Sequence, residues 1–160
     1  MKNRNIEHAD HWATPPFVYD ELNKCFDFDF DPTPFKHDVN KWDGLLIDWK
    51  ERNYINPPYS RKLKEAFVKK AISESKKGKL CVMLLPVSTS TEIFHEAILP
   101  NADKIEFRKK RIPFIGVNTK GQLVNWHLWD KEPPFEGEHV KNSGMHDSMV
   151  VVFDGRKQIT

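Results

Sequence analysis

Short runs of apolar residues alternate with amphipathic stretches along the 160 residues of the chain. Residues 80–85 form an uninterrupted apolar run of strand length, which is typical of the covered middle of a sheet. Residues 26–31 alternate phenylalanine with aspartate, and this period of two predicts a strand with one apolar face. The pattern predicts further strands over residues 45–47, 52–55, 104–108, 111–115 and 149–153.

Segments whose apolar residues recur at helical spacing lie between these predicted strands. Thr14-Pro15-Pro16 offers a capping hydroxyl and prolines suited to a first turn, and predicts a helix that runs to about Lys24. Ser60 is a candidate cap for a second helix, through about Lys77, that Gly78 ends. A third helix is expected from about residue 89 or 90 to residue 98. This alternation predicts an α/β sandwich around a mainly parallel sheet, with ligands bound beyond the carboxyl ends of the strands.

Residues 116–147 interrupt the alternation with a long polar stretch, in which Trp126 and Trp129 stand among Gly, Pro, Asn and His. A structureless stretch of this length inside a compact domain usually has a function. We therefore expect one domain over residues 1–160 with an insertion at 116–147.

Composition is that of an ordinary globular protein. The net charge is +2, so any nucleic-acid-binding surface has to be a local patch. Cys25 and Cys81 belong to no C-x-x-C pair, and we expect both to be reduced and buried in a cytoplasmic setting. We expect no signal peptide and no membrane span, because the apolar runs are too short. His8-x-x-His11 lacks further ligands at metal-site spacing, so no metal is expected.

The motif Asn56-Pro57-Pro58-Tyr59 lies between the predicted strand 52–55 and the helix after Ser60. Asn-Pro and Pro-Pro also occur in simple turns. A match to Asp, Asn or Ser followed by Pro-Pro and an aromatic residue nevertheless arises by chance at roughly the 1% level in a chain of this length. The motif is therefore the strongest candidate for chemistry.

These residue types suit methyl transfer to a planar amine such as the N6 amine of adenine. The lone pair of this amine is delocalised into the ring, so a site has to localise it by accepting hydrogen bonds from both N–H groups. The Asn56 side-chain oxygen and the Pro57 carbonyl are the expected acceptors, and the prolines stiffen their loop. Tyr59 offers a flat face for the base, and such stacking is worth roughly 1–3 kcal/mol.

The methyl donor has to lie in line behind the amine nitrogen. Holding two reactants in an attack geometry can supply roughly 7–11 kcal/mol of the barrier. No strong general base is expected, because the amine loses its proton as positive charge builds on it. In duplex DNA the adenine amine is stacked and paired, so the base has to be flipped out.

Nearly the whole chain resembles the phage-type DNA N6-adenine methyltransferases. The matching elements, in order, are Trp12-Ala13-Thr14-Pro15, Phe28-Asp29-Phe30-Asp31-Pro32, Asp43-Gly44-Leu45 with Asp48-Trp49, Asn56-Pro57-Pro58-Tyr59-Ser60, Met83-Leu84-Leu85-Pro86, Arg111-Ile112-Pro113-Phe114 and Met149-Val150-Val151-Val152-Phe153. The resemblance implies a compact Rossmann-like class I methyltransferase fold with helices on both faces of the sheet. It also implies S-adenosylmethionine as donor, adenine N6 in DNA as acceptor and a bacteriophage source.

The resemblance further implies a set of donor-binding residues, namely Trp12, Thr14, Pro15, Asp31, Pro32 and, as a less central candidate, Asp48. It assigns Asn56, Pro57, Pro58 and Tyr59 to the target amine.

The chain departs from the usual methyltransferase pattern after Asp31, where Pro-Thr-Pro-Phe replaces a glycine-rich loop. Only residues 32–55 separate Asp31 from Asn56, so an abbreviated donor cavity is expected. Asp38, Asp43 or Asp48 then takes the place of the usual ribose-binding acid, or no residue does.

Candidate contacts to DNA follow the motif and recur later in the chain. They are Tyr59, Ser60, Arg61, Lys62, Arg111 and Trp126. The lysines of the helix after the motif fit either a solvated face or a phosphate-contacting ridge; they are Lys62, Lys64, Lys69, Lys70, Lys76 and Lys77. Phosphate contact is also a candidate role for residues 108–111, and residues 116–147 are the candidate for recognition of the DNA sequence.

Two alternatives stay open at this point. The same motif can present cytosine N4, an RNA adenine or a protein glutamine, because all are planar amines. The chain can also be a nucleic-acid-binding module that descends from a methyltransferase and no longer binds the donor, which the missing glycine loop favours. The sequence leaves the oligomeric state unknown.

Overall fold

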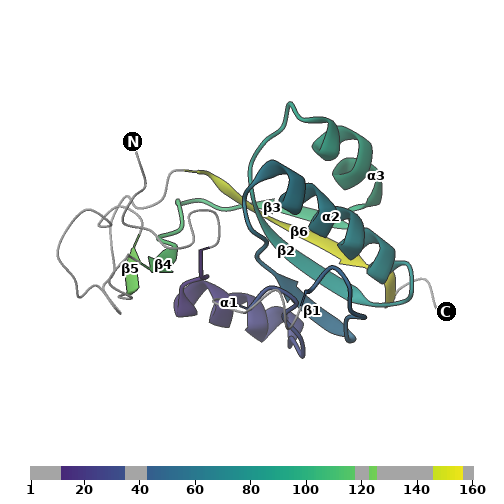
Figure 1. Ribbon diagram of the computed structural model, residues 1–160, viewed down its shortest axis with the longest axis horizontal. Helices are drawn as coiled ribbons and strands as arrows, with labels where there is room; N and C mark the ends of the chain where they lie inside the picture. The colour runs from purple at the N-terminus through teal and green to yellow at the C-terminus, as the bar shows by residue number, and fades with distance from the viewer. Residues whose placement is uncertain (1–11, 35–42, 118–122, 126–145, 157–160) are drawn as a thin grey trace.

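A four-stranded sheet with helices on both faces forms the body of the protein (Figure 1). The computed structural model describes residues 12–34, 43–117, 123–125 and 146–156. The order of the strands is β1 (Arg52–Ile55), β2 (Leu80–Pro86), β6 (Ser148–Asp154) and β3 (Lys104–Phe107). Among the described residues, none of the helices has both the length and the apolar character needed to cross a membrane.

The prediction of a mainly parallel sheet is wrong for the described strands. β1 and β2 pair in parallel, but β6 pairs antiparallel with both β2 and β3. It follows that β1, β2 and β3 share one direction and that β6 alone is reversed between two of them. Helix α2 (Arg61–Ser75) connects β1 to β2, and η1 (Phe94–Ile98) with α3 (Leu99–Asn101) connects β2 to β3, as parallel crossovers require. The described residues between β3 and β6 contain no such crossover helix, and a periodic apolar pattern does not itself encode strand direction.

The two faces of the sheet carry separate apolar clusters. Helices α2 (Arg61–Ser75) and η1 (Phe94–Ile98) cover one face, together with Trp49. Helix α1 (Pro16–Phe26) covers the other face through Val18 and Leu22. Figure 1 shows α2 and α3 (Leu99–Asn101) on one side of the sheet and α1 on the other. The prediction of helices on both faces is therefore confirmed for the described residues.

Helix α1 lies close to where the sequence predicts it, but it is longer at its C-terminal end. Asp27 follows the helix in the left-handed conformation with φ 51°. The predicted strand over 26–31 is wrong, because Phe26 still belongs to the helix. What remains is a single parallel bridge between Phe30 and Asn53, with Tyr54 N donating to the Phe30 carbonyl at 2.9 Å. Cys25, near the end of α1, is exposed rather than buried, whereas Cys81 is buried as predicted.

Three other predicted elements differ in the structure. Residues 45–47 belong to a turn in which Leu46 is 83% exposed, not to a strand. A strand begins only at Ile115, as β4 (Ile115–Val117) paired with β5 (Leu123–Asn125), because Pro113 has no N–H to give to a ladder. The predicted helix to residue 98 is π-helical over η1 and continues through α3.

The other periodic predictions are confirmed. β1, β2, β3 and β6 lie at the predicted positions to within one or two residues, and α2 ends before Gly78, which has φ 93°. Part of the predicted insertion 116–147 forms the β4–β5 pair. Trp126 and Trp129 lie outside the described residues.

Candidate active site

A cavity of about 160 Å³ lies beyond the carboxyl end of β1. Its lining comes from the segment before α1, from α1 itself, from the turn after Phe30 and from β1 with its following loop. The lining residues are Trp12, Ala13, Thr14, Tyr19, Asp31, Thr33, Tyr54 and Asn56. The structure thus brings the first motif residue, Asn56, together with three of the predicted donor-binding residues.

Asn56 is 5% exposed, and its side-chain amide is held by the segment before α1. Nδ2 donates to the Trp12 carbonyl oxygen at 2.6 Å and to the Thr14 hydroxyl oxygen at 3.2 Å. A main-chain carbonyl can only accept, so the NH₂ end of the amide has to face Trp12. None of the described residues donates a hydrogen bond to Asn56 Oδ1. The amide therefore keeps a hydrogen-bond acceptor for another molecule.

The segment 12–14 is itself held in place. Ala13 pairs with Ile115 through two main-chain hydrogen bonds, of 2.6 and 3.0 Å. Pro15 is the N-cap residue of α1, and its carbonyl accepts hydrogen bonds from Val18 N and Tyr19 N. The sequence predicts that the Thr14 hydroxyl caps the helix, and this prediction is wrong. The hydroxyl instead bonds to the Tyr54 hydroxyl. Thr14 and Pro15 thus connect the helix start to the motif.

Tyr54 is a site residue that the sequence analysis missed. Burial raises the pKa of its hydroxyl, which therefore stays protonated at any working pH. A signal was available, because side chains two residues apart on a strand share a face. Tyr54 thus had to lie on the same side of β1 as Asn56.

Asp31 reaches the cavity from the turn that follows the Phe30 bridge. Its Oδ1 accepts hydrogen bonds from Thr33 N at 2.8 Å and from the Thr33 hydroxyl at 3.1 Å. Pro32 is buried beside it and contacts Gly44 so closely that a Cβ on Gly44 would lie 2.2 Å from the Pro32 carbonyl oxygen. The Asp43–Gly44 turn therefore supports the Asp31 turn from outside the cavity.

The remaining candidate acids do not line the cavity. Asp48 is 86% exposed and lies 3.6 Å from the Lys77 ammonium, beyond the C-terminal end of α2. Asp43 Oδ1 accepts from Leu45 N within its own turn. Asp38 lies outside the described residues. Asp31 is thus the only carboxylate among the lining residues of the described part of the chain.

The other motif residues continue away from β1. Pro57 is buried, and Pro58 and Tyr59 are half-buried. The Tyr59 ring makes edge-to-face contacts with Phe114 and His146, with ring centroids 5.8 and 6.3 Å apart. Burial raises the pKa of Tyr59, and its buried hydroxyl has no hydrogen-bond partner among the described residues. The ring is therefore held by apolar packing, with part of its surface open.

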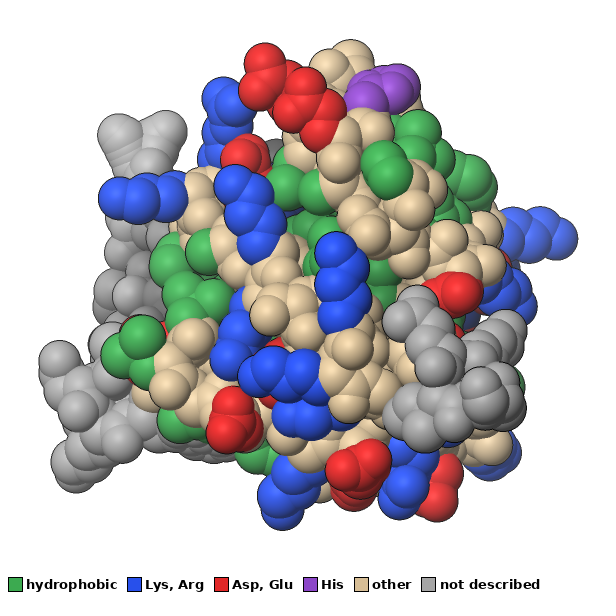
Figure 2. Space-filling view, turned by 90° about the vertical axis from the view of Figure 1, so that its right-hand side faces the viewer, with side chains coloured by type: hydrophobic (Ala, Val, Ile, Leu, Met, Phe, Trp, Pro, Cys, Tyr) green, Lys and Arg blue, Asp and Glu red, His purple; other side chains and the backbone are tan. Residues whose placement is uncertain are grey.

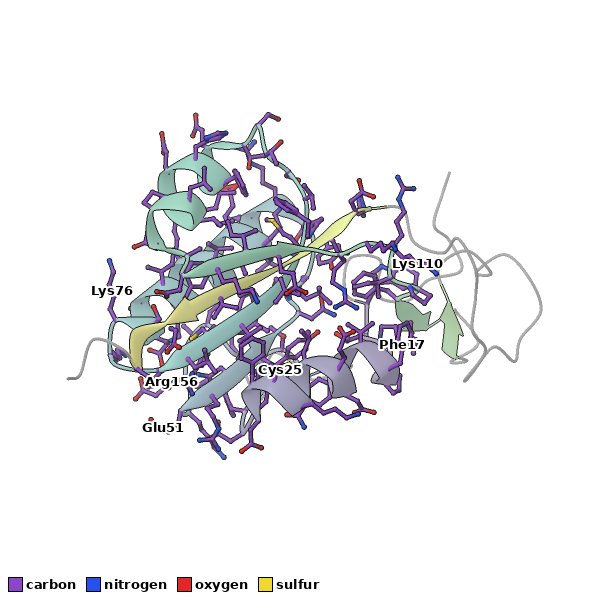
Figure 3. All side chains as sticks on the ribbon, turned by 180° about the vertical axis from the view of Figure 1, so that it is seen from behind. Phe17, Cys25, Glu51, Lys76, Lys110 and Arg156 are labelled. Carbon is purple, nitrogen blue, oxygen red and sulfur yellow. The ribbon has the colours of Figure 1, made fainter. Side chains whose placement is uncertain are left out.

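The predicted DNA contacts fall into two groups. Ser60, Arg61 and Lys62 are exposed at the start of α2, where Arg61 pairs with Glu65 at 3.0 Å. Arg111 pairs with Asp147 at 3.2 Å, and Arg108 forms an ion pair with Glu21 of α1. Figure 3 shows Lys110 and Phe17 at one end of the molecule and Lys76 at the other. The basic run 108–111 thus lies at the end of the molecule where α1 begins.

The lysines of α2 do not form one continuous ridge. Lys70 and Lys77 pair with the buried carboxylate of Glu74, at 3.5 and 2.7 Å. Lys76 lies at the end of the molecule opposite Phe17 (Figure 3). On the face drawn in Figure 2, basic and acidic side chains are interspersed. Only the first lysines of the helix are near the motif.

The described residues contain no group of three or more His, Cys, Asp and Glu side chains placed to hold a metal ion. Comparisons with known proteins add the family. No curated protein and no solved structure matches the chain. A family model described as DNA N-6-adenine-methyltransferase (Dam) matches residues 2–126, which include the cavity lining and the whole Asn-Pro-Pro-Tyr motif. The chain therefore belongs to the DNA N-6-adenine-methyltransferase (Dam) family and is an adenine-specific DNA methyltransferase.

Proposed function

We propose that the cavity binds the reacting part of S-adenosylmethionine and that Asn56 presents the adenine N6 amine to it. One observation carries this proposal: the Asn56 amide is oriented by two hydrogen bonds that leave Oδ1 as an acceptor at the edge of the cavity. An amine that bonds to Oδ1 lies next to a donor bound in the cavity. Methyl transfer needs the donor and the amine held side by side in this way.

The chemistry of the lining suits this donor. Asp31 supplies a negative charge, Thr14 and Thr33 are polar, and Trp12 and Tyr19 are aromatic. A sulfonium is a cation, which carboxylates attract and aromatic faces stabilise. The cavity is smaller than the roughly 300–1,000 Å³ of ordinary ligand sites. It therefore holds part of the donor, in keeping with the missing glycine-rich loop.

The protein's own residues prepare the amine. Asn56 Oδ1 accepts from one N–H and the Pro57 carbonyl from the other, which directs the nitrogen lone pair toward the donor. When bound, S-adenosylmethionine supplies a methyl group activated by its positive sulfur. Taking up the methyl group would make the N6 nitrogen positive, and this nitrogen would then release one of its two protons to solvent, so that the product is neutral N6-methyladenine. Tyr59 offers the exposed part of its ring to the flipped base.

Charges around the motif place the DNA. Arg61 and Lys62 on one side and residues 109–111 on the other are exposed, whereas Arg108 is half-buried in its ion pair with Glu21. Each cation that contacts a phosphate releases a counterion and steepens the salt dependence of binding. Ser60 and Trp126 are further proposed contacts, and residues 116–147 are proposed to recognise the DNA sequence.

The architecture supports a compact version of the Rossmann-like class I fold. Three co-directional strands carry one reversed strand among them, and helices cover both faces. A bacterial cytoplasmic setting, a bacteriophage source and a single domain over 1–160 are proposals that rest on the family resemblance.

Transfer of a labelled methyl group from S-adenosylmethionine to unmethylated DNA, followed by nucleoside analysis, tests the assignment. We expect label in N6-methyladenine and none with Asn56→Ala. Asn101→Ala is the matched control, since it also loses one side-chain amide hydrogen bond, from Asn101 of α3 to the Ala97 carbonyl of η1. A fully active Asn56→Ala would overturn the role of the motif.

Donor binding is measured separately by thermal unfolding. A ligand at 100 times its dissociation constant stabilises the fold by about 2.7 kcal/mol. We expect this stabilisation in the wild type and in Asn56→Ala, and a loss of it in Asp31→Asn. No stabilisation and no label in the wild type would mean that the chain has kept the fold and lost the reaction.

A further inference from the structure

We propose that Tyr54 is a positioning residue for methyl transfer, which acts through the Thr14 hydroxyl to fix the plane of the Asn56 amide. The inference rests on the proposed role of Asn56. Three side chains that belong to two separate parts of the chain form the relay. The Tyr54 hydroxyl bonds to the Thr14 hydroxyl, and Thr14 Oγ1 accepts from Asn56 Nδ2 at 3.2 Å.

The relay matters because one hydrogen bond alone does not fix the plane of the Asn56 amide. Asn56 has two N–H groups, of which one goes to the Trp12 carbonyl at 2.6 Å. This bond decides which end of the amide carries nitrogen, but it leaves the amide free to tilt about the bond. The second N–H, to Thr14, defines the plane. Only with both bonds does Oδ1 have one direction, and an acceptor for a reacting amine needs one direction.

Thr14 alone cannot supply a fixed acceptor. Its hydroxyl lies on a rotatable side chain in a half-buried segment, and it contacts no described hydrogen-bonding group besides Asn56 and Tyr54. Whichever of the two hydroxyls donates, the bond to Tyr54 gives Thr14 Oγ1 a second partner beside Asn56 and so restrains its rotation. The orientation of Thr14 is therefore set by Tyr54.

Tyr54 is suited to this role because its side chain is buried and packed between neighbouring rings. Its side chain is 2% exposed in β1, directly opposite Val82 of β2. The rings of Tyr19 and Phe28 contact it with centroids 5.2 Å away in each case. Burial raises the pKa of the hydroxyl, so the bond to Thr14 does not depend on pH in any ordinary assay. The relay thus transmits the rigidity of the sheet to a loop side chain.

Tyr54→Phe tests the proposal in the full-length enzyme, because it removes one oxygen and keeps the packed ring. A neutral hydrogen bond corresponds to about a three- to tenfold effect on a rate. We expect the single-turnover rate of methyl transfer to fall by about that factor, with the dissociation constant for S-adenosylmethionine changed less than twofold. Ser75→Ala is the control: it also removes a buried hydroxyl bond, to the Ile72 carbonyl at 2.8 Å, but at the far end of α2.

A spectroscopic measurement separates positioning from general loosening. The side-chain amide protons of Asn56 give a ¹⁵N-resolved NMR signal whose exchange with solvent reports their hydrogen bonds. We expect faster exchange in Tyr54→Phe and unchanged exchange in Ser75→Ala. Unchanged exchange in Tyr54→Phe, or a full single-turnover rate, would overturn the relay.

A double-mutant cycle tests whether Tyr54 acts through Thr14. Thr14→Val removes the hydroxyl and keeps the shape, and Thr14→Ser restores it. If the relay holds, Tyr54→Phe costs nothing further in the Thr14→Val background and its full cost returns with Thr14→Ser. Independent, multiplying effects would refute the relay. An inactive Asn56→Ala beside a fully active Tyr54→Phe would reject the relay and leave the proposed function intact, whereas an inactive wild type would reject the function itself.

Discussion

Glu74 is a fully buried carboxylate that joins the segment before β1 to α2 and to the start of β2. Its Oε1 accepts from Trp49 N at 2.8 Å and from the Lys79 ammonium at 2.7 Å, and its Oε2 accepts from Lys77 at 2.7 Å. Although burial by itself raises the pKa of Glu74, these donors together with the Lys70 charge lower it to about 2. We predict that Glu74→Gln strongly destabilises the fold.

The pKa bounds the size of this effect. The usual pKa of a glutamate is 4.5. A pKa that differs by one between the folded and unfolded chains changes the free energy of unfolding by about 1.4 kcal/mol. The fall of the Glu74 pKa to about 2 therefore sets an upper limit of about 3.4 kcal/mol on what the ionised carboxylate contributes to the free energy of unfolding. Lys77 is half exposed, so solvent screens its share. A loss of about 2 kcal/mol in the free energy of unfolding is the expected result at pH 7.

The pH dependence has a definite sign. Because folding lowers the pKa, the stabilisation is complete above pH 4.5 and is lost as the pH falls through about 2. Urea unfolding of wild type and Glu74→Gln between pH 7 and pH 3 measures it, and the difference should shrink by more than half. Glu65→Gln is the control, since the exposed Arg61–Glu65 pair is worth about 0.5 kcal/mol or less. Equal losses in the two variants, or a difference that does not change with pH, would refute the reasoning.

Two further predictions concern the surroundings of the cavity. Gly44→Ala puts a Cβ against the Pro32 carbonyl, so we expect a cost of about 1–3 kcal/mol in urea unfolding and weaker donor binding in titrations; unchanged values of both would contradict the supporting role of the turn. Tyr59→Phe removes a buried hydroxyl that has no partner in the described part of the chain, so we expect stability to stay level or rise by up to about 1 kcal/mol and methyl transfer to stay within twofold. A marked loss of stability would mean that the hydroxyl is bonded in solution.

Periodicity predicted the elements whose pattern is strong and unbroken. The apolar runs 80–85 and 149–153 and the helix after Ser60 all lie where their spacing puts them. The prediction failed at residues 26–31, because an alternating pattern does not reveal that the preceding helix continues through Phe26 and turns at Asp27. The periodic pattern also did not predict the direction of β6, since the pairing of this strand depends on the path of the chain after β3.

Residue types grouped the candidate site residues better than nearness in sequence did. Residues 32–55 separate Asp31 from Asn56 in sequence, yet the two meet at one cavity, because the Phe30 bridge sets both beyond the same end of β1. Asp48 lies closer to Asn56 in sequence but not in space. β1 separates them, and four residues of strand span about 13 Å. Tyr54 was missed because a tyrosine in a strand is usually part of the core, and the second role proposed for it rests on its bond to Thr14, which the sequence does not show.

If the cavity binds the donor as proposed, the segment 12–14 lets a short chain manage without a glycine-rich loop. The segment lines the cavity and, through the Trp12 carbonyl and the Thr14 hydroxyl, also holds the Asn56 amide. Its bridge to Ile115 ties it in turn to the chain that follows the basic run 108–111. Under the proposed function, a displacement of this backbone segment would change the donor cavity and the direction of Asn56 Oδ1 together, and the segment would take the place of a separate donor-binding loop. Tyr54→Phe differs from such a displacement, because it removes one hydroxyl and leaves the backbone of the segment in place.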